Sequence, residues 1–411
     1  MTDFRQCRFC KSELTTTFVE LGETPLANSY LTAEEAAEGR DKAYPLKVYV
    51  CGSCFLVQAE DPVSPEAIFS DYAYFSSYSD SWVAHARLYA DAMTERFGLS
   101  SSSRVVEIAS NDGYLLQHFV AKGIPVLGIE PAANVAEVAR ARGVATDVAF
   151  FGRETARRLA SEGISADLMA ANNVLAHVPD IADFVAGFPI LLTPDGVATF
   201  EFPHLLNLIA QTQFDTIYHE HYSYLSLVSV EKVLASARLR VFDVEEWPTH
   251  GGSLRVFACH EAADHVETER LRLLREKESV AKLDDLSGYA GFAERVDEVK
   301  ASFKAFLAEE KLAGKTIAAY GAAAKGNTFL NVCGITREDI GQVFDRSLAK
   351  QGKLLPGSHI PVLSPDEIRT FRPDYLVILP WNLCEEICAS LSYVSEWGGQ
   401  FVVAVPQTRV L

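Results

Sequence analysis

The feature that most constrains the fold is the stretch from Arg104 to Glu130, RVVEIASNDGYLLQHFVAKGIPVLGIE. An apolar run at residues 105–108 ends in a small, polar turn at residues 109–113. A helical stretch follows, and a second apolar run at residues 126–129 ends in an acid. This order predicts strand, turn, helix and strand, as in the first βαβ unit of a nucleotide-binding sheet.

The polar residues of this unit indicate which ligand it suits. Ser110, Asn111 and Gly113 allow close approach of the backbone to a ligand at a helix N-terminus, and Glu130 suits the two hydroxyls of a ribose. The dinucleotide pattern G-x-G-x-x-G is absent, and Glu107 at the strand end would repel a pyrophosphate. The set favours a cationic, adenosine-bearing ligand such as S-adenosylmethionine over NAD. The alternative is an ordinary βαβ unit with a polar turn.

A later strand, residues 166–171, leads to a second group of polar side chains at the same sheet edge. Asn172 and Asn173 end it, and His177 follows in a loop. Open α/β sheets bind ligands beyond the carboxyl ends of their strands, so we expect these residues to face the same crevice as Ser110 and Glu130. His177 is either a base or a neutral hydrogen-bonding residue. Two further strands, residues 239–245 and 253–259, predict an antiparallel pair at the end of the sheet.

Four of the eight cysteines form two CxxC pairs, Cys7 with Cys10 and Cys51 with Cys54. Four thiolates at this spacing suit a structural zinc ion with no open coordination position. Disulfides are the alternative, which the lack of a secretory signal disfavours. Short strand-like pieces around the pairs predict a small β-rich zinc domain.

Charge and hydropathy exclude several classes of protein. The chain has 37 basic and 55 acidic side chains, a net charge of −18, whereas nucleic-acid partners require a basic surface. It contains no apolar run of the ~18 residues that span a membrane, and its first residues have no signal-peptide core. We therefore expect a cytoplasmic protein that binds neither nucleic acid nor membrane.

The densest cluster of titratable side chains lies at residues 218–222, Tyr-His-Glu-His-Tyr. In an extended segment Tyr218, Glu220 and Tyr222 would share one face, and His219 and His221 the other. An acid/base cluster is the favoured interpretation, because a carboxylate beside an imidazole orients it and raises its basicity. The alternatives are a metal site, for which a third ligand is missing, and a solvated aromatic loop.

Residues 69–78 combine three tyrosines and two phenylalanines with hydroxyl side chains. The segment either covers the core or forms a lid that presents the phenols of Tyr72 and Tyr74 to a substrate.

A second α/β unit begins near residue 315. Its small-residue turn at residues 321–328 exposes backbone N–H groups to an anion, and Lys325 adds charge. Asn327 stands where a Walker motif has lysine, and Arg346 lies beyond a later strand. The unit either holds a phosphate-bearing substrate or is purely structural. The pattern predicts three parts: a zinc domain at 1–66, a central α/β domain at 67–265 and a C-terminal Rossmann-like α/β domain at 266–411.

Together these motifs resemble the sugar C-methyltransferases of deoxysugar biosynthesis, which act on nucleotide-linked 4-keto-6-deoxyhexoses. The resemblance rests on CRFC, CGSC, PLANSYL, SDYAYFSSYS, VVEIASNDGYLL, NNVLAHVPD, YHEHYSYLS, THGGSLR and YGAAAKGNT. It implies a seven-stranded, Rossmann-like methyltransferase domain in the centre, with S-adenosylmethionine and structural zinc as cofactors. It also implies His221 as catalytic base, with Tyr72, His177, Tyr218 and Glu220 as partners.

We further expect a monomer, a dTDP-linked sugar as substrate and methylation at C-3 in preference to C-5. The expected substrate contacts are Tyr72, Tyr74, Tyr222, Lys325, Asn327 and Arg346. Transfer to carbon requires a base that removes a proton beside the ketone and donors for the enolate oxygen. The rival class is a zinc-containing methyltransferase that acts on RNA, which the net charge disfavours.

Overall fold

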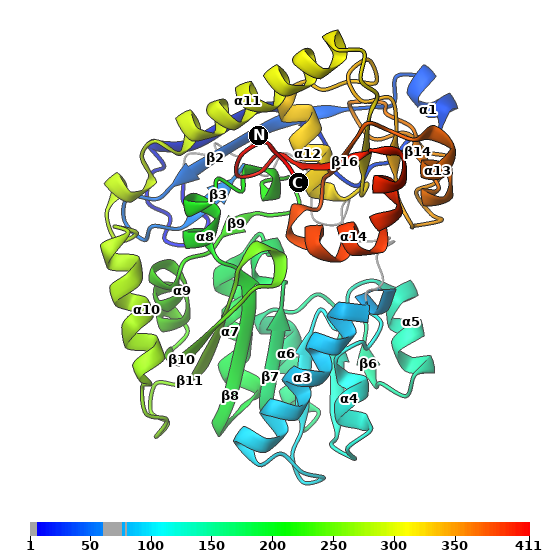
Figure 1. Cartoon of the computed structure of the whole chain (residues 1–411). Helices are drawn as coiled ribbons and strands as arrows, with labels where there is room; N and C mark the ends of the chain where they lie inside the picture. Colours follow the sequence, from blue (N-terminus) through cyan, green and yellow to red (C-terminus); the bar gives the residue numbers. More distant parts are fainter. Residues whose placement is uncertain (1–5, 61–75, 79) are drawn as a thin grey trace.

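The computed structural model describes residues 6–60, 76–78 and 80–411 (Figure 1). The seven-stranded sheet occupies the lower half of Figure 1, and the N-terminal strands lie in the upper half beside the C-terminal α/β unit. None of the described helices is long and apolar enough to cross a lipid bilayer.

The N-terminal region forms a small antiparallel sheet, as its strand-like pieces predict. Strands β1 (Thr16–Pro25), β2 (Ala43–Val50) and β3 (Val57–Ala59) follow in order, with the short helix α1 (Ala33–Ala37) between β1 and β2. The fourth strand is β9 (Ser223–Tyr224), which pairs antiparallel with β3. The N-terminal sheet is therefore completed by two residues that directly follow the Tyr-His-Glu-His-Tyr cluster.

The central domain is built on a seven-stranded sheet of order β10-β11-β8-β7-β4-β5-β6. Its parallel strands are β4 (Val105–Ile108), β5 (Val126–Ile129), β6 (Thr146–Asp147), β7 (Ala166–Asn172) and β8 (Leu192–Pro203). The hairpin of β10 (Leu239–Trp247) and β11 (Ser253–His260) adds the expected antiparallel pair to β8. The seven-stranded α/β fold is thus confirmed.

Helices cover both faces of this sheet. They are α3 (Asp80–Phe97), α4 (Leu116–Val120), α5 (Ala133–Ala141), α6 (Arg153–Ser161), α7 (Ile181–Leu191) and α9 (Leu227–Ser236). Helix α8 (Leu205–Ala210) follows β8 and belongs to a different buried cluster, with residues of β1. Val105 packs in one buried cluster with Ala90 of α3, and Val106 in another with Val185 of α7. Successive strand residues point to opposite faces, so a run that is apolar at every position indicates a sheet covered on both sides.

Two long helices, α10 (Glu269–Val280) and α11 (Phe292–Leu312), lead into the C-terminal α/β unit. Its sheet has the order β14-β13-β12-β15-β16-β17, with only β17 antiparallel to its neighbour. The elements are β12 (Ile317–Tyr320), α12 (Ala324–Cys333), β13 (Val343–Phe344), β14 (Val362–Leu363), α13 (Ile368–Phe371), β15 (Tyr375–Ile378), α14 (Cys384–Ser390), β16 (Gln400–Val403) and β17 (Arg409–Val410).

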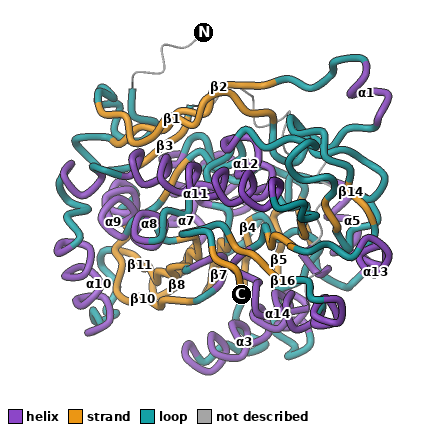
Figure 2. The backbone as a smooth tube through the Cα atoms, turned by 45° about the horizontal axis from the view of Figure 1, so that its top comes forward, coloured by secondary structure: helices purple, strands orange, loops and turns teal. Residues whose placement is uncertain are grey.

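The N-terminal and C-terminal regions share one apolar core, although they are far apart in the sequence. Figure 2 shows α11 and α12 beside β1, and the Phe18 ring stacks on Phe292 with centroids 4.4 Å apart. Residues of β1, α11 and α12 belong to the same buried cluster. The predicted division of the chain at residues 66 and 265 stays a prediction, but the outer two parts are packed together.

Candidate active site

The turn after β4 has an unusual backbone. Ala109, Asn111 and Gly113 have φ angles of 55°, 48° and 78°, a left-handed conformation that costs energy for residues with a side chain. A Cβ on Gly113 would lie 2.9 Å from Val144 Cγ2, so glycine is required there. The Asn111 side-chain oxygen accepts a 2.8 Å hydrogen bond from the backbone of Ser76. The turn is held in a strained shape of the kind that concentrates at functional sites.

Glu130 lies beside this turn at the end of β5, as predicted. Its two carboxylate oxygens each accept a 2.9 Å hydrogen bond, one from Asn111 N–H and the other from Ala132 N–H. Burial raises the pKa of Glu130, and these two backbone donors oppose the rise. The bonds fix the carboxylate, and each oxygen keeps a lone pair for a further donor.

Several buried polar atoms around the turn have no hydrogen-bond partner within the part of the chain that the structure describes. They are Glu107 Oε2, Ser110 Oγ, Asp112 Oδ1, Asn172 Oδ1 and Asn173 Oδ1. All but the serine hydroxyl are acceptors only. Burial, and secondarily the charges of Glu130 and Asp112, hold the pKa of Glu107 well above its usual value. Such a set calls for a ligand that brings donors and positive charge.

His177 and His221 lie together at the carboxyl edge of the same sheet, with ring centroids 4.6 Å apart. The Tyr218 ring is 4.1 Å from that of His221. The Nδ1 atom of His221 is 2.8 Å from the carbonyl oxygen of Thr216, and Nδ1 of His177 is 2.7 Å from that of Glu220. Because a carbonyl only accepts, each imidazole carries its proton on Nδ1.

Desolvation lowers the pKa of both histidines. That of His177 falls to about 4, and that of His221 lies well below its usual value. Repulsion from His177, His250 and Lys325, when these groups are charged, would further disfavour a proton on His221, and the hydrogen bond to Thr216 O opposes this. A neutral His221 therefore presents an unprotonated Nε2 at neutral pH.

Residues 218–222 do not form one extended segment, the case in which alternate side chains would share a face. Residues 219 and 220 form a turn, which the 2.9 Å hydrogen bond from His221 N–H to Tyr218 O closes, and the strand pairing of β9 begins at Ser223. The turn separates the side chains of the cluster from one another, so that they have different partners. The ring nitrogen Nε2 of His219 lies 3.1 Å from Pro45 O, and the Glu220 carboxylate accepts a 2.7 Å bond from Asn28.

The expected pairing of the Glu220 carboxylate with an imidazole is accordingly not seen among the described residues; its backbone carbonyl orients His177 instead. Tyr222 is fully buried, with the guanidinium of Arg8 5.2 Å from its ring centroid. Tyr72 and Tyr74 lie outside the described residues.

The three expected substrate contacts of the C-terminal unit lie in different environments. Lys325 donates a 2.6 Å hydrogen bond to Asn382 Oδ1 and lies 4.8 Å from the centroid of Trp381. Asn327 is buried and donates to the carbonyl of Ala27 at 2.6 Å. The Arg346 side chain is 77% exposed. Of the three, Lys325 affects the histidine cluster electrostatically.

Sequence reasoning missed four residues of the site. Thr216 orients His221 through its carbonyl, Asn28 binds Glu220, and His250 Nε2 lies 3.2 Å from the Asn173 amide nitrogen. Asp215, next to Thr216, accepts a 2.7 Å bond from the Trp381 indole of the C-terminal unit. Two of these residues, Asn28 and His250, lie in the motifs PLANSYL and THGGSLR. Neither motif has a spacing of side chains that indicates catalysis.

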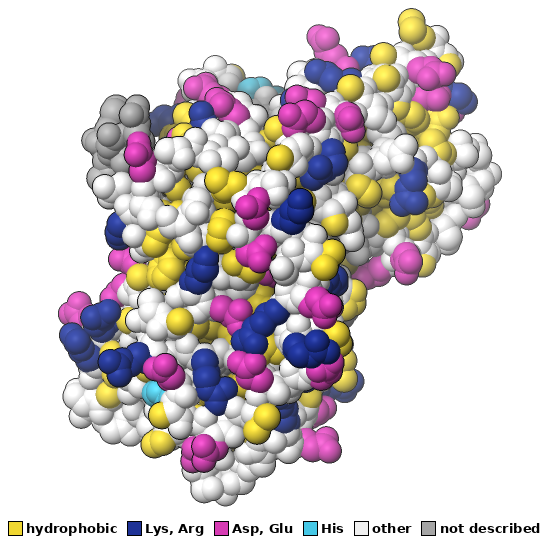
Figure 3. Space-filling model, turned by 90° about the vertical axis from the view of Figure 1, so that its left-hand side faces the viewer, with side chains coloured by type: hydrophobic (Ala, Val, Ile, Leu, Met, Phe, Trp, Pro, Cys, Tyr) yellow, Lys and Arg dark blue, Asp and Glu magenta, His cyan; other side chains and the backbone are white. Residues whose placement is uncertain are grey.

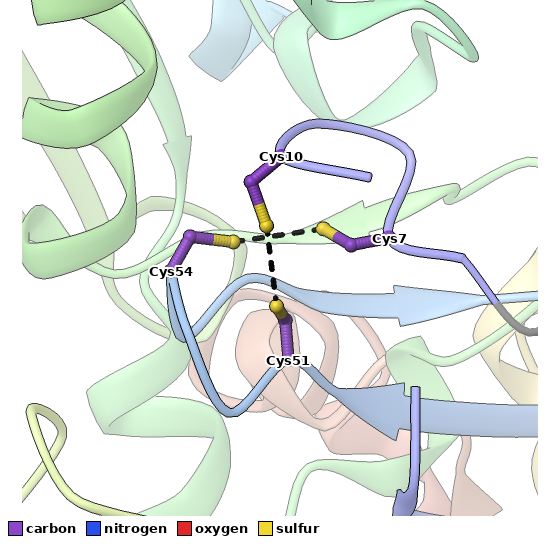
Figure 4. Close-up of side chains that lie close together, drawn as sticks. All are labelled: Cys7, Cys10, Cys51 and Cys54. Atoms are coloured by element: carbon purple, nitrogen blue, oxygen red, sulfur yellow. Dashed lines mark hydrogen bonds between the residues drawn. The ribbon is translucent and has the colours of Figure 1, made fainter. Parts of the chain in front are cut away.

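The four N-terminal cysteines converge as predicted (Figure 4). Their sulfur atoms all lie within 4.8 Å of one another, and Cys7–Cys54 and Cys10–Cys51 are both 3.5 Å apart. Four thiolates at about 2.3 Å from a tetrahedral zinc ion would be roughly 3.8 Å apart. Gln58 donates a 3.2 Å bond to the sulfur of Cys7. Among the described residues, no other group of three or more His, Cys, Asp or Glu side chains is arranged to hold a metal.

Comparisons with known proteins agree with this architecture. Family models match at residues 7–69 (a zinc binding domain), 82–244 (a methyltransferase domain) and 248–406 (a C-methyltransferase C-terminal domain). The C-methyltransferase NovU of Streptomyces niveus is 39% identical over 406 residues, which cover 99% of this chain and 96% of that protein. The chain belongs to the C-methyltransferase family.

Solved methyltransferase structures match less than half of this chain, at low sequence identity. Magnesium protoporphyrin IX methyltransferase from Synechocystis, with bound S-adenosylmethionine, is 14% identical with a TM-score of 0.33, covering 47% of this chain and 88% of that chain. An S-adenosylmethionine-dependent methyltransferase from Clostridium acetobutylicum is 12% identical with a TM-score of 0.34, covering 42% and 90%.

The cofactors of this C-methyltransferase are S-adenosylmethionine and structural zinc, and its residues fit both. The unmatched acceptors at Glu107, Asp112 and Asn172 suit a cationic ligand, and the fixed carboxylate of Glu130 suits ribose hydroxyls. The four thiolates form a closed site, so the metal supports structure and leaves no coordination position for chemistry.

Proposed function

We propose that this C-methyltransferase methylates a carbon beside the ketone of a nucleotide-linked 4-keto-deoxy sugar, in unusual deoxysugar biosynthesis. C-3 is the favoured position, ahead of C-5, and dTDP is the expected carrier. The observation that carries the proposal is the bond between His221 Nδ1 and Thr216 O, which leaves Nε2 as a base beside Tyr218 and His177.

Methylation of carbon needs a nucleophilic carbon, and this chain offers the groups that make one. His221 Nε2 takes the proton from the carbon next to the ketone. The enolate oxygen that results is stabilised by a nearby donor, for which Tyr218 is the candidate, with Tyr72 as a further prediction. His177 already donates its Nδ1 proton to Glu220 O, so its neutral ring presents an acceptor at Nε2. S-adenosylmethionine, when bound, supplies an electrophilic methyl group whose sulfonium sulfur leaves as a neutral thioether.

The test is to incubate the enzyme with S-adenosylmethionine and dTDP-4-keto-6-deoxy sugars in deuterated buffer, and to follow product mass and the sugar C–H signals. We expect one added methyl group and deuterium exchange beside the ketone. The variant His221→Asn should reduce turnover about 10²–10⁴-fold, the usual contribution of a general base, and keep its affinity for S-adenosylmethionine.

A matched control is His359→Asn in the C-terminal unit, which removes an exposed imidazole whose Nε2 lies 3.0 Å from Asp41. It should retain full turnover. Full activity of His221→Asn would refute the base assignment, and methylation of RNA in place of the sugar would refute the substrate.

Charge supports a small anionic substrate over RNA. The chain carries a net charge of −18, and on the face seen in Figure 3 basic and acidic side chains are interspersed. Zinc-binding thiolates persist under reducing conditions, which supports our placement of the enzyme in the cytoplasm.

A further inference from the structure

A short segment of the N-terminal region, residues 26–31, reaches the catalytic cluster; we call it the strap. Asn28 donates its side-chain N–H to Glu220 Oε1 at 2.7 Å, across 192 positions of sequence. The Asn28 side chain is exposed, whereas Glu220 is only 6% exposed. The strap therefore brings an amide donor from the protein surface onto a buried carboxylate of the site.

The C-terminal unit holds the strap from the other side. Asn327 Nδ2 donates to the carbonyl of Ala27 at 2.6 Å, and the Tyr30 hydroxyl donates to the carbonyl of Ala322. Leu31 forms a β-bridge with Leu354. Residues on both sides of Asn28 are thus fixed, so its amide has little freedom to leave Glu220. Asn327, expected to contact substrate, instead contacts the strap.

The N-terminal sheet holds Glu220 itself. Strand β3 pairs with β9, which begins three residues after Glu220, and the ring nitrogen Nε2 of His219 lies 3.1 Å from Pro45 O in β2. The loop that carries the base is consequently anchored to the zinc-binding region on one side and to Thr216 on the other. The side chain of Asn28 donates a hydrogen bond to the Glu220 carboxylate of this loop.

We propose that Asn28 is a positioning residue, which holds Glu220 oriented so that its second oxygen accepts a hydrogen bond from the substrate. The assignment rests on the proposed function, because the substrate group it implies is a hydroxyl of the keto sugar. Among the described residues no hydrogen bond to Glu220 Oε2 is found, so this oxygen keeps its acceptor capacity for a further donor.

Electrostatics agree with this role. Burial raises the pKa of Glu220, and the hydrogen bond from Asn28 opposes the rise. Loss of the amide donor would therefore let the carboxyl group take up a proton at a higher pH, and a protonated carboxyl group is a poorer acceptor.

A double-mutant cycle separates positioning from packing. Asn28→Ala should lower kcat about tenfold, the lower end of what losing a hydrogen bond to a charged group gives. In the Glu220→Ala background the same change should cost less than about twofold, because the acceptor of the Asn28 amide is gone. Equal factors in both backgrounds would overturn the proposal. Ser29→Ala, an exposed neighbour in the strap, is the matched control and should leave kcat unchanged.

The pH profile gives a readout that a packing role would not move. In Asn28→Ala the acid limb of kcat should shift to higher pH, because the pKa of Glu220 rises, whereas Ser29→Ala should keep the profile of the original enzyme. A uniform loss of kcat at every pH would contradict the assignment.

A spectroscopic measurement keeps the inference distinct from the proposed function. In protein labelled with 13C at the glutamate carboxyl carbons, the Glu220 signal is identified by its loss in Glu220→Gln. Its pKa should be higher in Asn28→Ala than in the original chain, and an unchanged pKa would overturn the positioning role. If the original enzyme methylates no keto sugar, the proposed function fails, and this titration still decides whether Asn28 controls Glu220.

Discussion

The turn after β4, residues 109–113, and the turn after β12, residues 321–323, both connect a buried parallel strand to a helix. At the first turn, buried oxygen atoms of Glu107, Ser110 and Asp112 have no partner among the described residues. In the second, Ala322 N–H donates to Asp345 at 2.7 Å, and the Ala322 carbonyl accepts from Lys350 at 2.6 Å and from Tyr30.

The difference shows that one local pattern can serve two purposes. The first turn keeps unmatched acceptors and so requires a ligand to complete its hydrogen bonds. Much of the second turn is completed within the protein by Asp345 and by the strap, so it joins the C-terminal unit to the N-terminal region. The carboxylate of Asp345 beside it also disfavours a phosphate there. The hydrogen-bond partners around a turn, rather than the spacing of its glycines, decide whether the turn binds a ligand or joins two parts of the protein.

Of the tests that compare the two turns, the largest effect is expected from removing the Glu130 carboxylate that lies beside the first turn. Glu130→Ala should weaken S-adenosylmethionine binding about 100-fold, since hydrogen bonds to a charged acceptor contribute about 1.5–3 kcal/mol each. Isothermal titration calorimetry measures the change in Kd. The control Glu137→Ala removes the same charge from an exposed position of α5 and should bind the cofactor normally. An unchanged Kd in Glu130→Ala would remove the first turn from the cofactor site.

A smaller effect of a different kind is expected in the second turn. Asp345→Ala leaves the N–H groups of Ala322 and Ser347 without their acceptor, which should lower the free energy of unfolding by about 1–3 kcal/mol. The Kd for S-adenosylmethionine should stay within twofold. Chemical denaturation and calorimetry give the two quantities, and Asp366→Ala, an exposed acid of the same unit, serves as reference. Weaker cofactor binding in Asp345→Ala would contradict the contrast between the turns.

Those parts of the fold that depend on local periodicity could be predicted from the sequence. Strands β4 at Val105–Ile108 and β5 at Val126–Ile129 have the predicted bounds, and the hairpin of β10 and β11 occurs where it was expected. By contrast, β9 could not be predicted, because a strand of two residues has no periodicity and exists only through its pairing with β3.

Site residues were predictable where side chains follow a strand end. Glu107 and Glu130 lie where the βαβ pattern places them, and the four cysteines converge as their spacing predicts. Asn28 and Thr216 were not predictable, since one acts across the chain and the other through a backbone carbonyl that any residue possesses. The roles of the individual site residues remain predictions for the experiments described above.

The smallest expected effect is the release of protons when the cofactor binds at the first turn. Burial raises the pKa of Glu107 well above its usual value and also raises that of Glu130, so these carboxyl groups hold protons at higher pH than free ones. A bound cation favours the ionised forms, so binding should release up to about one proton, and the Kd should increase as pH falls. Titration calorimetry in two buffers of different ionisation enthalpy measures the release. Glu107→Gln should reduce the number of protons released, whereas Asp345→Ala beside the second turn should leave that number unchanged. If Glu107→Gln releases as many protons as the original enzyme, Glu107 is not the group that ionises.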